Sequence, residues 1–120
     1  MELDGEKIRE EVAKNLADED RIAEAHIEIN NPHVAVRMRR TGVDEFTAAE
    51  VMEDAREIVR VADRVSDFKA FKPRLSSDEV HSGAYLEFNN IDGDTNQVSD
   101  EIKASLADLG YTLVDKRFPI

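Results

Sequence analysis

Two histidines lie among carboxylates in segments where apolar and polar residues alternate. His26 falls in the segment 21–30 and His81 in the segment 80–89. Alternate side chains of a β-strand point to the same face of a sheet, so the polar members of each segment share one face. A histidine titrates near neutral pH and a carboxylate can orient its ring, which together suit general acid–base catalysis. The expected polar face carries Glu24, His26, Glu28, Arg37, Arg39, His81, Tyr85 and Glu87.

This polar face has a second interpretation, as a binding surface. Catalysis would require His26, His81, Tyr85 and Glu87 to line one pocket. The open face of an antiparallel sheet is ordinarily polar, so the same residues also fit solvent exposure or contact with a partner. Tyr85 favours contact, because amphipathic aromatic residues are enriched at interfaces. We therefore place binding before catalysis.

Two short motifs have some features of ligand sites. Arg37-Met38-Arg39-Arg40 is the one basic cluster and would suit phosphate, but glutamates in the preceding segment are expected to neutralise part of it. The segment 92–96 places oxygen ligands at alternate positions, as at the start of an EF-hand loop. Gln97 and Lys103 then occupy the positions that need glycine and a bidentate glutamate. Neither a metal nor a cofactor is expected.

The first two strands should form a hairpin around Pro32. For both apolar sets to share one face, the loop must contain an even number of residues. Four residues suit it better than two, because proline cannot adopt the positive φ of the primed turns. The same register brings opposite charges together across the pair, which supports it. It sets Ile29 opposite Val34, Ile27 opposite Val36, Ala25 opposite Met38, Glu24 opposite Arg39 and His26 opposite Arg37.

Three segments have the spacing of amphipathic helices. The first covers residues 3–18, the second runs from a capping box at Thr47-Ala48-Ala49-Glu50 to about Val65, and the third ends near Leu109. Phe46 and Val51 are expected to form a hydrophobic staple at the start of the second helix. Asp94 or Thr95 should cap the third helix, and Gly110 follows it as a C′ residue.

These elements predict one α+β domain over residues 1–120. The order is α-β-β-α-(β)-β-α-β, with helices on one face of a mostly antiparallel sheet and the other face open. Strands are expected over 80–89 and 111–118, while 68–75 is ambiguous because Pro73 would restrict a strand there to a sheet edge. With that strand the order from His33 is βαββαβ, which is ferredoxin-like. The N-terminal hairpin strand would then have to displace another strand.

The acidic composition limits the classes of partner. The chain of 120 residues has 27 acidic and 16 basic residues, a net charge of −11. Such a field repels phosphate backbones and anionic lipids, so nucleic acids and membranes are disfavoured. The acids are dispersed and 10 arginines outnumber 6 lysines, which fits adaptation to a salty cytoplasm, as in halophilic proteins. An acidic docking face or a nucleic-acid mimic would cluster its charge instead.

Composition also excludes several kinds of chemistry. With no cysteine the chain has no disulfide, no Cys-ligated metal centre and no reactive thiol. No apolar run approaches the roughly 20 residues of a membrane span. The N-terminal residues lack the basic and then apolar pattern of a secretory leader. A cytoplasmic location is therefore expected.

The sequence predicts a small binding or assembly module. Its contact would be made through the open sheet face or an unpaired strand edge, with a protein partner or with a second copy in a homo-oligomer. The alternative is a small hydrolase or isomerase that pairs His26 or His81 with a carboxylate. A third option is an acidic inhibitor or nucleic-acid mimic.

Overall fold

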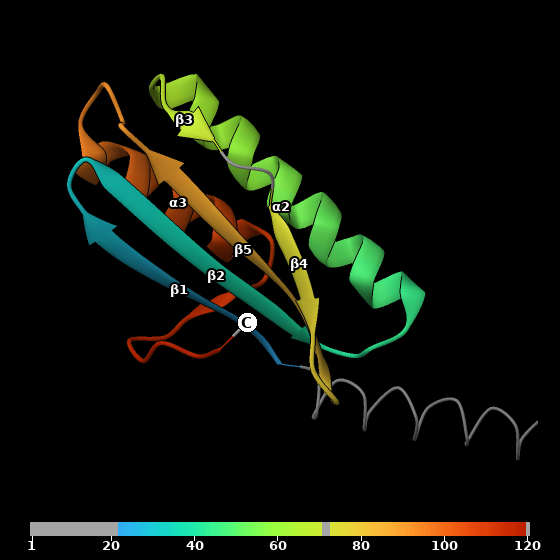
Figure 1. Cartoon of the computed structure of the whole chain (residues 1–120). Coiled ribbons are helices and arrows are strands. Elements are labelled where there is room, and N and C mark those ends of the chain that lie inside the picture. Colours follow the sequence, from blue (N-terminus) through green and yellow to red (C-terminus); the bar gives the residue numbers. More distant parts are fainter. Residues whose placement is uncertain (1–21, 71–72, 120) are drawn as a thin grey trace, which may run out of the picture.

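The computed structural model describes residues 22–70 and 73–119 (Figure 1). It confirms a mixed α+β fold, in which a mostly antiparallel sheet carries two helices. The helix expected over residues 3–18 lies outside the described residues. The elements are β1 (Ala23–Asn30), β2 (His33–Thr41), α2 (Glu45–Val65), β3 (Lys69–Ala70), β4 (Arg74–Ser77), β5 (His81–Asn89), α3 (Thr95–Asp108) and β6 (Thr112–Leu113).

The strand order shows where the N-terminal hairpin strand fits. The order is β3-β5-β2-β1-β6, and β4 also pairs with β5. β6 runs parallel to β1, and the other pairs are antiparallel. β1 thus lies between β2 and β6 in the sheet. β6 therefore pairs with β1 and not with β2.

The ambiguous segment 68–75 contributes to two short strands. β3 pairs with the C-terminal end of β5, and β4 pairs with its N-terminal half. Pro73 directly precedes β4 and has no amide hydrogen to donate to a ladder, so an edge position suits it. One edge of the sheet is therefore made of two pieces.

The β1–β2 hairpin has the predicted register. Glu24 lies opposite Arg39 and His26 opposite Arg37. The loop is shorter than expected, because only Asn31 and a cis Pro32 separate the strands. The predicted loop length was wrong, but the loop does contain an even number of residues. This parity places the apolar side chains of both strands on the same face of the sheet.

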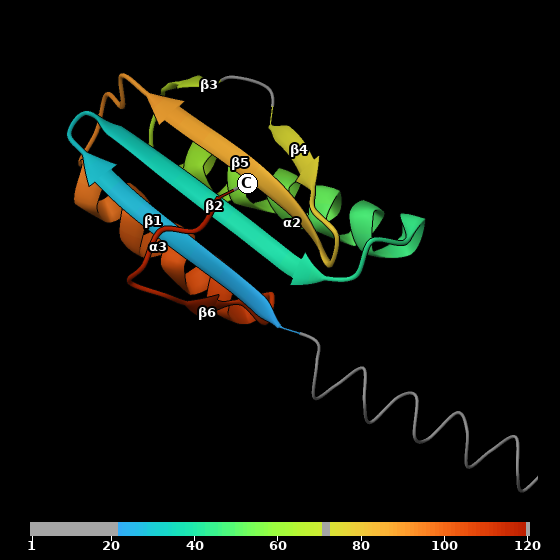
Figure 2. The ribbon, with the colours of Figure 1, turned by 60° about the horizontal axis from the view of Figure 1, so that its bottom comes forward.

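The core lies between one face of the sheet and the two helices (Figure 2). Burial of each large aliphatic or aromatic side chain there contributes roughly 1.5–3 kcal/mol. The predicted apolar faces of the strands and helices supply these side chains. They include Val34, Val36, Met38, Leu86 and Phe88 from the strands, and Val51, Ile58, Val98, Ile102 and Leu106 from the helices.

Each helix has an aspartate as its N-cap, but α2 begins earlier than predicted. Its N-cap is Asp44, whose carboxylate accepts hydrogen bonds from the Thr47 amide (2.8 Å) and hydroxyl (2.9 Å). Thr47 is therefore the third residue of the helix. The predicted staple is also wrong, because the Phe46 side chain is 76% exposed. For α3, Asp94 is the N-cap and Gly110 follows with a φ of 91°, as expected.

A largely buried polar network joins the end of β2 to both helices. The Arg40 guanidinium donates to the Asp54 carboxylate from α2 at 3.1 Å and to the Leu109 carbonyl at 2.7 Å. The Tyr111 hydroxyl donates to the same carboxylate at 2.7 Å. Burial, together with this hydrogen bond, raises the pKa of Tyr111 above its ordinary value. Since the Arg40, Asp54 and Tyr111 side chains are all paired, the network fixes the α3–β6 turn against α2.

The C-terminal segment does not form the long strand predicted over 111–118. β6 ends at Leu113, and the chain then crosses the face of the sheet opposite the helices (Figure 2). Phe118 is only 6% exposed in this position, and the Arg39 guanidinium carbon lies 4.2 Å from its ring centre. Folding back therefore buries an aromatic ring.

Candidate binding surface

The eight predicted site residues lie at the positions of β1, β2 and β5 that alternate with the core residues. The structure brings them together in separate small groups. Arg39 binds Glu24 through two hydrogen bonds of 2.8 and 3.1 Å. Tyr85 donates a hydrogen bond to Glu87 at 3.0 Å, and burial together with this bond raises the pKa of Tyr85. The remaining members form two histidine sites.

His26 holds the C-terminal segment in place. Its Nδ1 lies 2.9 Å from the Val114 carbonyl oxygen, so the tautomer protonated at Nδ1 donates a hydrogen bond to it. Its Nε2 lies 3.3 Å from the Glu28 carboxylate. Only 9% of the residue is exposed. Both ring nitrogens therefore have structural partners.

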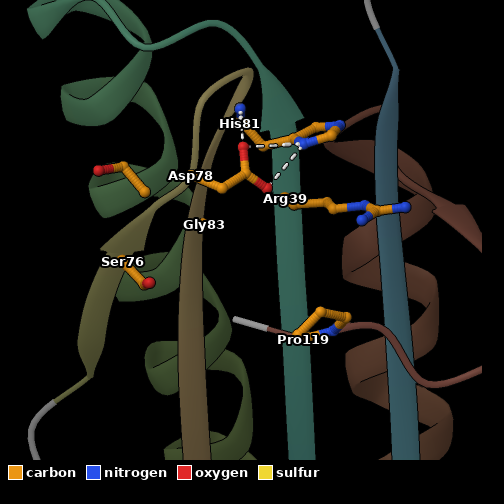
Figure 3. A pocket seen from close by; sticks show the side chains of 7 residues that line it. Arg39, Ser76, Asp78, His81, Gly83 and Pro119 are labelled. Atoms are coloured by element: carbon orange, nitrogen blue, oxygen red, sulfur yellow. Dashed lines mark hydrogen bonds and ion pairs between the residues drawn. The ribbon is translucent and has the colours of Figure 1, made fainter.

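His81 is the first residue of β5 and adjoins the turn that leads from β4 (Figure 3). Its Nδ1 lies 3.0 Å from the Asp78 carboxylate. The Asp78 carboxylate also accepts hydrogen bonds from the Val80 and His81 amides, at 2.7 and 2.6 Å. These two amide bonds lower the pKa of Asp78 to about 2. The spacing of an Asp three residues before a strand-initial His is the signal that could have identified this turn.

The two histidines do not meet. His26 pairs with Arg37, which pairs with Tyr85, so His26 and Tyr85 are two strands apart. His81 lies four residues further along β5. Strand spacing and rise then separate the two histidines by roughly 16 Å. His81 shares a hollow with Ser76, but in Figure 3 that side chain lies apart from its ring, and no described hydroxyl hydrogen-bonds to it.

Arginines gather instead around Tyr85. Arg37 on β2 and Arg74 on β4 both pair with Tyr85 in the sheet, from opposite sides. Each guanidinium carbon lies 4.9 Å from the centre of the tyrosine ring. Arg117 and Phe118 of the C-terminal segment join them around one hollow. Sequence reasoning missed Arg74 and Arg117, because each comes from a segment whose path it could not predict.

The exposed edge at β4 lies beside an apolar end of the molecule. All four residues of β4 are exposed. The Gly42 amide donates to the Val80 carbonyl at 2.7 Å, which places Val43 next to Val80. Leu75 shares a hollow with Ala48 at the start of α2. Val43, Leu75 and Val80 are among the five most exposed large apolar side chains of the described residues, together with Ile22 and Phe46.

Residues 22–70 and 73–119 contain neither a cluster of metal ligands nor a helix that could span a membrane. No three His, Asp or Glu side chains converge there as a metal ion would require. Neither of the helices in this part of the chain has the length and apolar character needed to cross a bilayer. Comparison with known proteins adds no assignment, since the chain matches no protein-family model, no curated protein and no solved structure.

Proposed function

We propose that the protein is a small assembly module that pairs with a second copy of itself through β4. The observation that carries this proposal is the fully exposed edge strand Arg74–Ser77 beside an apolar end. An edge strand presents unpaired amide and carbonyl groups, and two identical edges can pair antiparallel about a two-fold axis. We infer that the contact lies at this edge and not on the open face, because the C-terminal segment already crosses that face.

The side chains around β4 support this contact. Phe46 and Leu75 are 76% and 51% exposed, and large aromatic and aliphatic side chains contribute most to the centre of an interface. The other edge offers less, because β6 has only two residues and covers one end of β1. The chain from β2 onward is, in this proposal, a ferredoxin-like unit whose last strand is displaced by β1.

The net charge sets the conditions under which the pairing occurs. Each copy carries −11, so two copies repel each other at low ionic strength. Salt screens this repulsion, with a Debye length of about 10 Å at 0.1 M and about 3 Å at 1 M. Apolar contacts and backbone hydrogen bonds are screened far less. The dimer should therefore strengthen as salt is added.

Light scattering after size-exclusion chromatography tests the proposal. At 1 M KCl we expect a mass of twice the 13.5 kDa chain. Leu75→Lys places a charge at the exposed edge and should give a monomer, although it reduces the net negative charge. Ile29→Lys is the matched control, since Ile29 is also exposed but lies on β1. A monomer at all salt concentrations, or equal effects of the two variants, would contradict the β4 contact.

A further inference from the structure

We propose that the hollow beside Tyr85 binds a small phosphorylated ligand. The hollow has a volume of about 610 Å³, within the usual range of roughly 300–1,000 Å³ for small-molecule sites. It lies on the open sheet face, whereas the proposed dimer contact uses the backbone edge of β4. Three arginines and no carboxylate are found among its lining residues, which are Arg37, Arg74, Tyr85, Arg117, Phe118 and Pro119.

The protein neutralises the arginines of this hollow only in part. Arg37 and Arg117 share a single carboxylate, that of Glu28, at 3.3 and 3.8 Å. Among the described residues no carboxylate lies within 4.0 Å of the Arg74 guanidinium. With the Glu87 carboxylate on the Tyr85 hydroxyl counted as well, three cations face two carboxylates, which leaves an excess of 3 − 2 = +1. Such an excess inside a chain of net charge −11 marks this hollow as a local anion site.

The geometry holds two of the guanidinium groups before any ligand arrives. Arg37 and Arg74 both lie against the Tyr85 ring, a cation–π arrangement that fixes their positions. The Arg37 side chain is only 11% exposed, so its charge is partly desolvated. Arg117 is far more exposed and approaches from the C-terminal segment. Groups held in advance lose less conformational entropy on binding.

The chemistry of the hollow selects a phosphoryl group on a small molecule. A guanidinium donates two parallel hydrogen bonds to a phosphoryl group, and three guanidiniums can satisfy several oxygens of a diphosphate. The faces of Tyr85 and Phe118 leave apolar surface for the rest of the ligand. The overall field penalises a ligand in proportion to its charge, so a diphosphate is repelled much less than a nucleic-acid strand. A free metabolite is therefore favoured over a polynucleotide as the source of the group.

Isothermal titration with pyrophosphate at low ionic strength tests the site. We expect saturable binding of one pyrophosphate per chain. Arg74→Gln and Arg117→Gln should each weaken it by roughly tenfold or more, the usual loss for a hydrogen bond to a charged group. Arg60→Gln is the matched control, because Arg60 is an exposed arginine on α2. The affinity of this variant for pyrophosphate should equal that of the wild type. An equal loss in Arg60→Gln would show general charge attraction and overturn the site.

Two further arms separate this site from its alternatives. An oligothymidylate of twelve nucleotides should bind more weakly than pyrophosphate, and tighter binding would overturn the assignment to a small ligand. The Leu75→Lys variant should keep its pyrophosphate affinity whether or not it dimerises. Absence of binding in the wild-type chain at millimolar pyrophosphate would refute the phosphate site and leave the dimer contact unaffected.

Discussion

Asp78 shows at the scale of one residue how a turn fixes a charged group. Its carboxylate accepts hydrogen bonds from the backbone amides of Val80 and His81. The Nδ1 atom of the His81 ring makes a third contact with it. A carboxylate with such partners is stabilised in its charged form. The Asp78–His81 pair resembles the acid–base arrangement predicted from the sequence. Its hydrogen bonds to backbone amides, however, give it a structural role in the turn between β4 and β5. The same carboxylate that orients His81 also holds the backbone of that turn.

The low pKa of Asp78 has a consequence for stability at acid pH. The folded value of about 2 lies below the unfolded value of about 3.9 for aspartate. A group whose pKa is lowered on folding stabilises the protein above its unfolded pKa. That contribution is lost as the pH falls from about 4 to about 2. A carbon-detected NMR titration of the Asp78 carboxyl should give a midpoint near 2.

The matching variant separates this turn from the rest of the sheet. In Asp78→Ala the Val80 and His81 amides lose their acceptor and should exchange with solvent faster. The amides of the β1–β2 hairpin serve as the internal control, since Asp78 does not contact that hairpin in the described hydrogen bonds. A carboxyl midpoint near 4, or unchanged exchange at both amides, would contradict the assigned contacts.

The cap of α2 illustrates a limit of motif reading at the scale of an element. The sequence Thr47-Ala48-Ala49-Glu50 matches a capping box, yet the helix begins one turn earlier at Asp44. Both residues have capping chemistry, and the pattern alone cannot choose between them. Thr47 donates its hydroxyl to Asp44, so the residue predicted as the cap supports the actual one. Glu50 turns instead to Arg40, at 3.4 Å.

These two possible caps predict different costs on substitution. Asp44→Ala removes the acceptor of the Thr47 amide and should lower the free energy of unfolding by about 1 kcal/mol. Glu50→Ala removes the side chain that a capping box at Thr47 would need, yet it should change the free energy of unfolding by less than about 0.5 kcal/mol, because Glu50 makes only a partly exposed ion pair. Urea unfolding of both variants, with equal m-values, measures the difference. The reverse order of effects would restore the capping box at Thr47.

Elements were predictable where periodicity and side-chain pairing agreed. The β1–β2 register and the faces of β5 follow from the alternation itself, because a slip of one residue would move every apolar side chain out of the core. The path of the C-terminal segment was not predictable. It depends on a contact between Phe118 and Arg39, which are far apart in the sequence, and no local pattern encodes that contact. The arginine hollow was missed for the same reason, since Arg117 reaches it on that segment.

At the scale of the whole molecule, charge and fold oppose each other. With 27 acidic and 16 basic residues, at least 27 − 16 = 11 acids lack an opposite charge anywhere in the chain. The compact state holds these charges closer together than the unfolded chain does, which destabilises it. The ion pairs on α2, such as Arg56–Glu53 and Arg60–Glu57, are exposed and contribute only about 0.3–0.5 kcal/mol each. Screening therefore removes more repulsion than attraction.

Added salt should consequently raise the melting temperature. We expect a progressive rise in KCl from 0.05 to about 1 M, steepest at the low end where the Debye length changes most. Dimerisation would also raise the melting temperature by mass action, so the decisive measurement uses the Leu75→Lys variant at constant protein concentration. If the melting temperature of that monomeric variant stays flat or falls, repulsion is not what limits its stability. If it rises in parallel with the wild type, the acidic surface itself responds to salt, independently of assembly.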